Sequence, residues 1–148
     1  MNDEGDFSSV MHYYFNTILR IRRDLRARVQ QHLIQSGYAD VTLEMSQVIY
    51  SLWELGGQAN QQEIANIVGK NKSSITSLVD NLVKRQMVRR EMDPADRRNN
   101  IITLTDKARV FMADFYPKVY KTYDITKAGM TLADVRHLTE MLNKIMRS

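Results

Sequence analysis

Short hydroxylated and basic side chains crowd the segment from Asn71 to Gln86, and side chains of this kind hydrogen-bond to nucleic-acid bases and phosphates. With about 100° between successive residues of a helix, Ser73, Ser77 and Lys84 fall on one side. Small polar groups let a helix backbone enter a major groove roughly 12 Å wide. The predicted DNA contacts on this helix are Asn71, Lys72, Ser73, Ser74, Thr76, Ser77 and Lys84. An ordinary solvated helix face has the same composition, so the neighbouring segments must distinguish the two interpretations.

A second cationic group, Arg97 and Arg98, lies between two segments with the composition of short strands, residues 87–92 and 101–104. An Asp-Pro pair between these segments favours a type I turn, which places the arginines at the tip of a hairpin. Arginine side chains there can enter a narrow minor groove, where the negative potential is strongest. We expect Asp96 to orient one guanidinium by a charge-assisted hydrogen bond. The alternative is an exposed hairpin tip whose ion pair contributes little.

Two short helices are predicted to hold the first group in place. The helix over residues 71–86 has an apolar stripe at i, i+3, i+4 and i+7, formed by Ile75, Leu78, Val79 and Leu82. The preceding helix has Asn60 as its N-cap, Glu63 three residues later and Gly69 at its end. Because only a few residues join the two helices, they must cross at a steep angle, as in a helix-turn-helix.

The positive charge of the chain is concentrated in the same region. Between residues 70 and 100 there are eight Lys and Arg against four Asp and Glu, a net charge of +4 that equals the formal net charge of the whole chain. Binding to phosphates would release counterions, so affinity for DNA should fall steeply with salt.

These segments, QQEIANIVGKNKSSITSLVDNLVKRQMVRRE followed by DPADRRNNIITLTDKA, resemble the core of the multiple antibiotic resistance regulator (MarR) family. Asp96, Arg98, Leu104 and Thr105 take the positions of that family's Asp-x-Arg and Leu-Thr wing motif. The resemblance implies that Arg98 is the minor-groove residue and Asp96 its organiser. It also implies a dimeric repressor that binds a pseudo-palindromic double-stranded DNA operator and is released by a small anionic or aromatic effector.

Two positions depart from the family pattern. Gln86 stands where family members usually have a glycine after the recognition helix, so a non-glycine residue must adopt positive φ there or the helix must end differently. Ala108 replaces a second glycine and should favour the helix that contains it.

The expected fold is mainly α with a small β-hairpin wing, a winged helix-turn-helix with N- and C-terminal dimerisation helices. The 148 residues suit a single domain, with the DNA-binding lobe at 42–105 and a helical stem at 8–36 and 106–147. Within the stem, a helix from about Thr105 to Ala128 should bend at Pro117. Thr131 is predicted to cap the last helix, whose apolar residues are spaced as in a helical seam: Val135, Leu138, Leu142 and Ile145.

Other features exclude several classes of protein. The chain has no cysteine, which excludes disulfides and thiol-based sensing, and it lacks a run of 18 apolar residues. No catalytic arrangement, phosphate loop or metal-ligand spacing is present, so we predict a cytoplasmic protein that is not an enzyme and that has no membrane contact, metal or cofactor. A winged-helix module that binds a protein partner remains the alternative.

Two surfaces have no assigned role in the sequence. The basic run from Arg20 to Arg28 winds around a helix and is interpreted as a solvated or salt-bridged face, with contact to flanking DNA or an acidic effector as the alternative. An effector site could involve the aromatic residues Tyr13, Tyr38, Trp53 and Phe111, although aromatics at helical spacing more often pack in a core.

Overall fold

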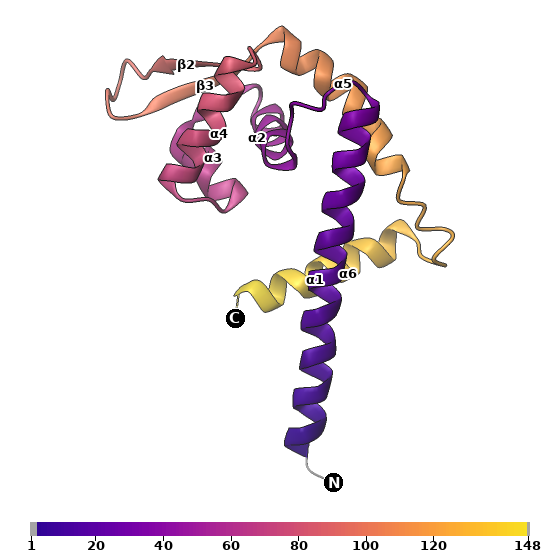
Figure 1. The fold of residues 1–148 in the computed structure, drawn as a ribbon. Coiled ribbons are helices and arrows are strands. Elements are labelled where there is room, and N and C mark those ends of the chain that lie inside the picture. The colour runs from indigo at the N-terminus through magenta and orange to yellow at the C-terminus, as the bar shows by residue number, and fades with distance from the viewer. Residues whose placement is uncertain (1–2, 148) are drawn as a thin grey trace. The chain divides into compact units, whose positions relative to one another are not determined.

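The computed structural model describes residues 3–147 and is mainly helical, with one small antiparallel sheet (Figure 1). In chain order the elements are α1 (Asp3–Gln35), α2 (Leu43–Glu54), β1 (Gln58–Asn60), α3 (Gln61–Val68), α4 (Lys72–Lys84), β2 (Val88–Met92), β3 (Asn100–Leu104), α5 (Asp106–Lys121) and α6 (Leu132–Arg147). The chain divides into two compact units, the first ending at Tyr116 and the second beginning at Pro117. The predicted winged helix-turn-helix fold is confirmed.

The sheet has β3 in its centre, with β1 and β2 paired antiparallel on either side. Ile102 lies opposite Ala59 in β1 and opposite Arg90 in β2. Figure 1 shows the β2–β3 hairpin extending past α3 and α4. The sequence predicts the hairpin but not β1, because a strand of three residues is too short to show an alternating pattern.

The core of the first unit lies where α2, α3 and α4 meet the sheet. Its fully buried side chains include Ile49, Leu52, Ile64, Ile75, Val79, Leu82 and Ile102. The stripe predicted on α4 therefore faces inward, with Leu78 half-buried at its edge. On α3, Ile64 is fully buried, whereas Ile67 keeps 54% of its surface exposed.

Side-chain caps fix the starts of the three short helices. Thr42, Asn60 and Asn71 are extended residues whose side-chain oxygens accept backbone N–H bonds from Met45, Glu63 and Ser74. Each cap satisfies a donor that has no partner within the helix. At the other end of α3, Gly69 adopts the left-handed conformation with φ 67°, as its position predicts.

The recognition helix α4 ends in a left-handed residue although no glycine is present. Gln86 has φ 59°, its N–H bonds to the Val83 carbonyl, and the Met87 N–H bonds to the Leu82 carbonyl. This pair of bonds is a Schellman motif. The Thr105 hydroxyl donates to the Gln86 carbonyl at 2.6 Å, so the Leu-Thr motif holds the end of α4. The first alternative expected from the sequence, a non-glycine residue at positive φ, is confirmed.

The stem helices differ from the prediction in their bounds. Pro117 lies inside α5, as expected, but α5 ends at Lys121 rather than near Ala128. The chain turns there because Asp124 accepts the backbone N–H of Thr126 and stabilises an irregular turn. In the second unit, Thr131 caps α6 as predicted, since its hydroxyl accepts the Asp134 N–H at 3.2 Å and its own N–H donates to the Asp134 carboxylate at 2.8 Å.

Replacing Gln86 by Gly should raise the free energy of unfolding by about 0.5–1 kcal/mol, because glycine adopts positive φ without a Cβ clash. The exposed glutamine side chain has little packing to lose. Urea denaturation measures the change. The control Gln86→Ala removes the same side chain but keeps the Cβ, and it should show no gain. A glycine variant no more stable than the alanine variant would contradict the strained conformation.

Candidate nucleic-acid interface

The exposed side of α4 carries four of the predicted contact residues. Lys72, Ser73, Ser77 and Lys84 are all exposed, while Ser74 and Thr76 are half-buried. The helix presents this side because its opposite stripe is buried in the core. The N-terminus of α4 is held by Asn71, whose side-chain oxygen accepts the Ser74 N–H at 2.8 Å. The structure thus brings an exposed row of short polar and basic groups to one surface.

The hydroxyl of Thr76 is committed to internal bonds. It donates to the Lys72 carbonyl at 2.8 Å and accepts from the side-chain amide of Gln61 at 2.7 Å. Gln61 is the first residue of α3, so Thr76 joins the two helices of the helix-turn-helix. The side chains of Asn71 and Thr76 therefore hold the contact surface in place, in addition to lying at its edge.

The hairpin tip is shaped by two aspartates that bond to the backbone. The Asp93 carboxylate accepts the Ala95 N–H at 2.9 Å, and the Asp96 carboxylate accepts the Arg98 N–H at 3.0 Å. The predicted bond from Asp96 to a guanidinium is wrong, because an aspartate in a turn bonds first to the N–H two residues ahead. Asp96 thus fixes the backbone that carries Arg98, and its second oxygen accepts the Asn99 side-chain amide at 3.3 Å.

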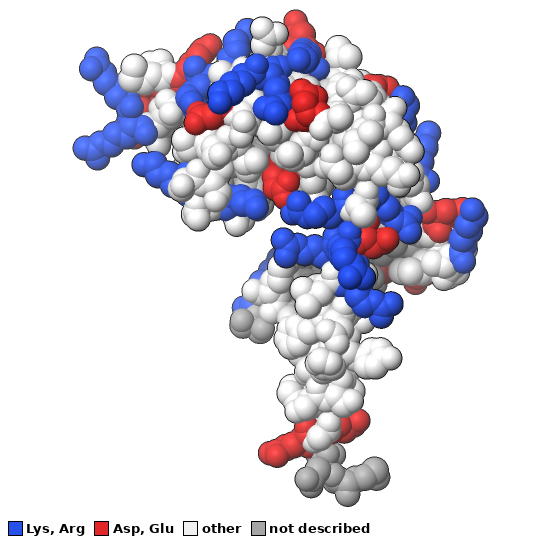
Figure 2. Space-filling model, in the orientation of Figure 1, with Lys and Arg blue, Asp and Glu red and all other residues white. Residues whose placement is uncertain are grey.

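Both arginines of the tip are exposed. Figure 2 shows Lys and Arg side chains projecting at the left edge of the molecule, where the β2–β3 hairpin ends in Figure 1. Arg97 and Arg98 are the Lys and Arg residues of the segment between β2 and β3. Both residues are exposed to solvent.

A groove of about 330 Å³ lies between the start of α4 and the base of the hairpin. Its cationic lining comes from Lys72, Arg90 and Arg98, and its other lining residues are the apolar Ile75 and five polar residues: Gln61, Gln62, Thr76, Asn99 and Asn100. Of the predicted contacts, Lys72 and Thr76 of the helix and Arg98 of the hairpin therefore meet at one groove, and the others do not line it. Nucleic-acid phosphates match such a surface in charge and in hydrogen-bonding capacity.

An ion pair missed by the sequence analysis connects the helix to the hairpin. The distance between Oδ1 of Asp80 in α4 and Nη2 of Arg90 in β2 is 2.6 Å. The Asp80 side chain is 49% exposed and the Arg90 side chain is 27% exposed. The pairing is between elements, so no helical or strand periodicity reveals it. The sequence gives one indication that Asp80 is unusual, because it is the single acidic residue between Lys72 and Lys84.

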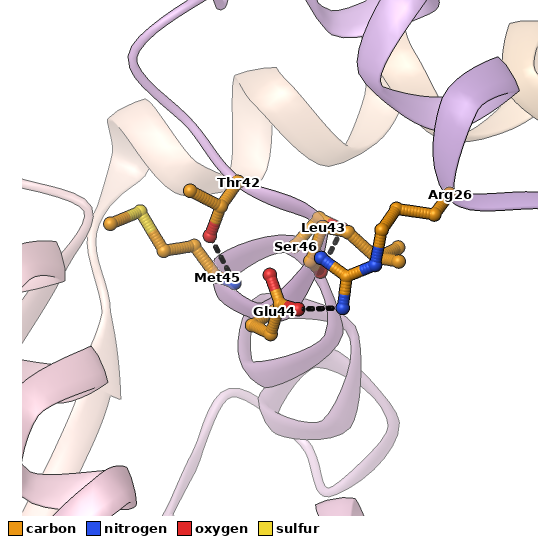
Figure 3. Close-up of polar contacts among 6 residues, drawn as sticks. All are labelled: Arg26, Thr42, Leu43, Glu44, Met45 and Ser46. Atoms are coloured by element: carbon orange, nitrogen blue, oxygen red, sulfur yellow. Dashed lines mark hydrogen bonds and ion pairs between the residues drawn. The ribbon is translucent and has the colours of Figure 1, made fainter. Parts of the chain in front are cut away.

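Two arginines of the basic run on α1 are paired, as the salt-bridged interpretation predicts. Arg28 bonds to Asp24 one turn earlier, at 2.8 Å, and Arg26 bonds to Glu44 in the first turn of α2 (Figure 3). Partial burial raises the pKa of Glu44, but hydrogen bonds and the positive charge of Arg26 outweigh it and hold the pKa below its ordinary value. Arg26 thus attaches α1 to the start of α2.

The aromatic residues suggested for an effector site do not gather in one place. Phe111 is fully buried and packs edge to face against Tyr38, with ring centres 4.7 Å apart. Trp53 keeps 45% of its surface exposed under the Arg109 guanidinium, and Tyr13 is 76% exposed on α1. A separate groove of about 380 Å³ lies beside the Arg26–Glu44 pair, with an apolar lining of Ile18, Ile21, Leu25, Leu43 and Val68 and a cationic one of Arg22, Arg26 and Lys70.

Residues 3–147 contain no cluster of three or more His, Cys, Asp or Glu side chains placed to hold a metal ion. Over the same residues, every helix is too short or too polar to cross a bilayer.

Comparison with known sequences finds regulators of transcription. Residues 41–99 match the MarR family profile. The uncharacterized HTH-type transcriptional regulator YwaE of Bacillus subtilis is 28% identical over 98 residues, 66% of this chain and 57% of that protein. The match therefore spans less than two thirds of that relative. The HTH-type transcriptional regulator MhqR of the same organism is 23% identical over 131 residues, 88% of each chain.

Comparison with solved structures shows the same fold. Reduced AbfR bound to DNA aligns over 99% of this chain and 98% of its own, with a TM-score of 0.80 and 18% identity. CouR from Rhodococcus jostii RHA1 bound to p-coumaroyl-CoA aligns over 87% and 88%, with a TM-score of 0.74 and 26% identity. NadR in complex with 4-hydroxyphenylacetate aligns over 87% and 89%, with a TM-score of 0.72 and 21% identity.

Substituting Asp96 by Ala should loosen the hairpin tip, because the Arg98 N–H loses its acceptor. A hydrogen bond of this kind contributes about 0.5–1.5 kcal/mol, so exchange of the Arg98 amide with solvent should accelerate up to about tenfold. Hydrogen exchange followed by NMR measures this rate. Asp96→Asn retains an acceptor oxygen and should exchange nearly as slowly as the unmodified protein. Equal exchange in the alanine variant would show that the turn does not depend on this carboxylate.

Proposed function

We propose that the chain is a transcriptional regulator of the MarR family, a sequence-specific repressor that binds double-stranded DNA as a homodimer. The observation that carries this proposal is the exposed row of short polar side chains on α4 beside a cationic hairpin tip. Helices with such a surface fit the major groove, and a neighbouring hairpin then reaches the flanking minor groove. The fold shared with DNA-bound AbfR supports this mode of binding.

In the major groove, Ser73 and Ser77 are assigned to base edges, and Lys72 and Lys84 to phosphates on either side. Hydroxyl groups donate and accept, so they bond to several bases, whereas lysine supplies a charge that attracts phosphate without regard to sequence. Asn71, Ser74 and Thr76 lie at the start of the helix, where backbone N–H groups also attract phosphate. The half-buried hydroxyls of Ser74 and Thr76 act mainly by shaping this end.

In the minor groove, Arg98 is assigned to the groove floor and Arg97 to its phosphate edge. Asp96 accepts the backbone N–H of Arg98 and so holds this part of the hairpin in place. Less conformational entropy is then lost when the Arg98 side chain enters the minor groove. A guanidinium is always charged and is favoured where a narrow groove concentrates negative potential. The Arg98 side chain also lines the groove beside Lys72, so the two contact regions would follow one stretch of the DNA backbone.

The dimer is proposed from apolar surface on the terminal helices. On α1, Phe7, Tyr13 and Leu19 are each at least 60% exposed, and α6 has no buried residue although Leu132 and Met146 are large and apolar. Exposed apolar surface of this extent marks interaction sites. We assign residues 8–36 and 106–147 to a dimer stem and residues 42–105 to the DNA-binding lobe. A two-fold dimer then reads two half-sites of a pseudo-palindrome.

A small anionic or aromatic effector is proposed to release the DNA from the groove beside Arg26. Apolar walls suit a ring, and a carboxylate would compete with Glu44 for the Arg26 guanidinium. Among the lining residues, Val68 ends α3, and Gly69 and Lys70 belong to the turn between α3 and α4, so a ligand there touches the helix-turn-helix directly. To act, it must bind the DNA-incompetent state more tightly. The chain has no cysteine, so thiol oxidation cannot supply the signal.

A winged-helix module that binds protein is the second candidate, and it would require an exposed apolar recognition face. The α4 face is instead hydroxylic and basic. The curated relatives are named as regulators of transcription, and we assign no catalytic activity to the chain. We also propose that the protein acts in the cytoplasm, because an operator-binding regulator needs access to the DNA.

The operator can be found by selecting bound duplexes from a random pool, and Arg98→Ala then tests the assignment. Loss of one groove contact should weaken operator binding by about 1–3 kcal/mol and reduce the salt slope by about one, with an unchanged melting temperature. Arg98→Lys keeps the charge but not the planar guanidinium, so it should retain the salt slope and recover only part of the affinity. Unchanged affinity in Arg98→Ala would contradict the assignment of the hairpin, and a slope near zero in the unmodified protein would favour the protein-binding module.

The effector site is tested with 4-hydroxyphenylacetate and related aromatic carboxylates, chosen from the ligand seen with NadR. Saturating ligand should weaken operator binding by the unmodified protein at least fivefold, which is a typical coupling between sites. Arg26→Gln should respond less than twofold when compared with its own affinity without ligand. Arg28→Gln changes a neighbouring arginine outside this groove and should respond as the unmodified protein does. An equal response in Arg26→Gln would place the ligand elsewhere.

A further inference from the structure

One acidic residue lies on the side of α4 that is proposed to face DNA. Asp80 follows Ser73 and Ser77 along the same side of the helix, one turn before Lys84. Its side chain is 49% exposed. A carboxylate facing a polyanion is repelled by each nearby phosphate, and Asp80 therefore opposes binding of any duplex, whatever its sequence.

The partner of Asp80 is a cation of the groove between α4 and the hairpin. Arg90 lies 2.6 Å from the Asp80 carboxylate and lines that groove together with Lys72 and Arg98. The Arg90 side chain is 27% exposed as a whole, but its Nε and Nη2 atoms are buried beside Asp80, so the guanidinium reaches a phosphate only after a rotamer change that breaks the pair. While the ion pair is formed, Asp80 neutralises the charge of the Arg90 guanidinium and holds the side chain in one direction.

The stability of the fold does not account for this pair. Half-exposed ion pairs contribute little to folding, and α4 is already held by Ile75, Val79 and Leu82 in the core. The Asp80 carboxylate has a larger effect on the electrostatic potential of the groove than on folding. It neutralises Arg90, one of the three cationic lining residues that attract phosphate. Attraction of this kind is independent of sequence and supplies most of the binding to random DNA.

We propose that Asp80 is a specificity-determining residue, which holds Arg90 away from phosphate and so limits binding to non-operator DNA. This inference rests on the proposed DNA-binding function. Arg90 is a positioning residue, because its ion pair with Asp80 also joins β2 to α4. The ratio of operator to random-duplex affinity is then set by Asp80 as well as by the residues that contact bases.

The test compares three variants with the unmodified protein on the selected operator and on a random duplex of equal length, over a series of salt concentrations. Asp80→Asn removes the charge and keeps the shape. Glu91→Gln is the matched control, because it also removes one negative charge, from the residue that follows Arg90 in β2. Glu91 has no ion-pair partner within residues 3–147. The double variant Asp80→Asn with Arg90→Gln removes both members of the pair.

In Asp80→Asn, the freed guanidinium should add one phosphate contact, which makes the log–log salt slope steeper by about 0.9 and raises random-duplex affinity roughly tenfold near 0.1 M salt. Operator affinity should rise less, so the ratio of the two affinities falls. Glu91→Gln should keep the slope of the unmodified protein, and the double variant should return to it.

Three results would overturn the inference: an Asp80→Asn slope equal to that of Glu91→Gln, a steeper slope that persists in the double variant, or equal weakening on both duplexes. The first means that Arg90 is not freed, the second that Arg90 is not the added contact, and the third that the pair is only structural. Failure of the proposed function is distinct, since the unmodified protein would then show no salt-dependent binding to any duplex.

Discussion

The apolar stripe of α4 is the constraint on which the remaining geometry depends. Ile75, Val79 and Leu82 are fully buried against the core, and burial of each such side chain contributes about 1.5–3 kcal/mol. A rotation of α4 that turned its hydroxyl groups inward would expose these three residues and bury polar groups without partners. The outward direction of Ser73 and Ser77 is therefore a consequence of the core, and the polar surface needs no stabilisation of its own.

Polar contacts then fix the position of this helix relative to its neighbours at both ends. At its start, Thr76 bonds to Gln61 of α3. At its end, the Gln86 carbonyl accepts the Thr105 hydroxyl, which connects α4 to the residue just before α5. The Asp80–Arg90 pair joins its middle to the hairpin. Helix, hairpin and the first turn of α5 are thereby held as one body, so an effector need only shift this body to change the fit to DNA.

Local chemistry could be predicted from the sequence, while contacts between elements could not. The caps Asn60 and Thr131 and the left-handed Gly69 depend on residues within one turn, so residue types and spacing reveal them. The ion pair of Asp80 joins residues of different elements, and its geometry follows only from the packed fold. Trp53 is an apolar residue of α2 yet remains 45% exposed. Its burial depends on which other elements pack against α2, and the sequence of α2 alone does not reveal them.

The outward face of α4 is proposed to read bases, and the double variant Ser73→Ala with Ser77→Ala tests this role most directly. Both side chains are exposed, so the melting temperature should not change. Two lost hydrogen bonds of about 0.5–1.5 kcal/mol each should lower operator affinity at least about fivefold while affinity for a random duplex stays the same. A ratio of operator to random affinity equal to that of the unmodified protein would contradict the account.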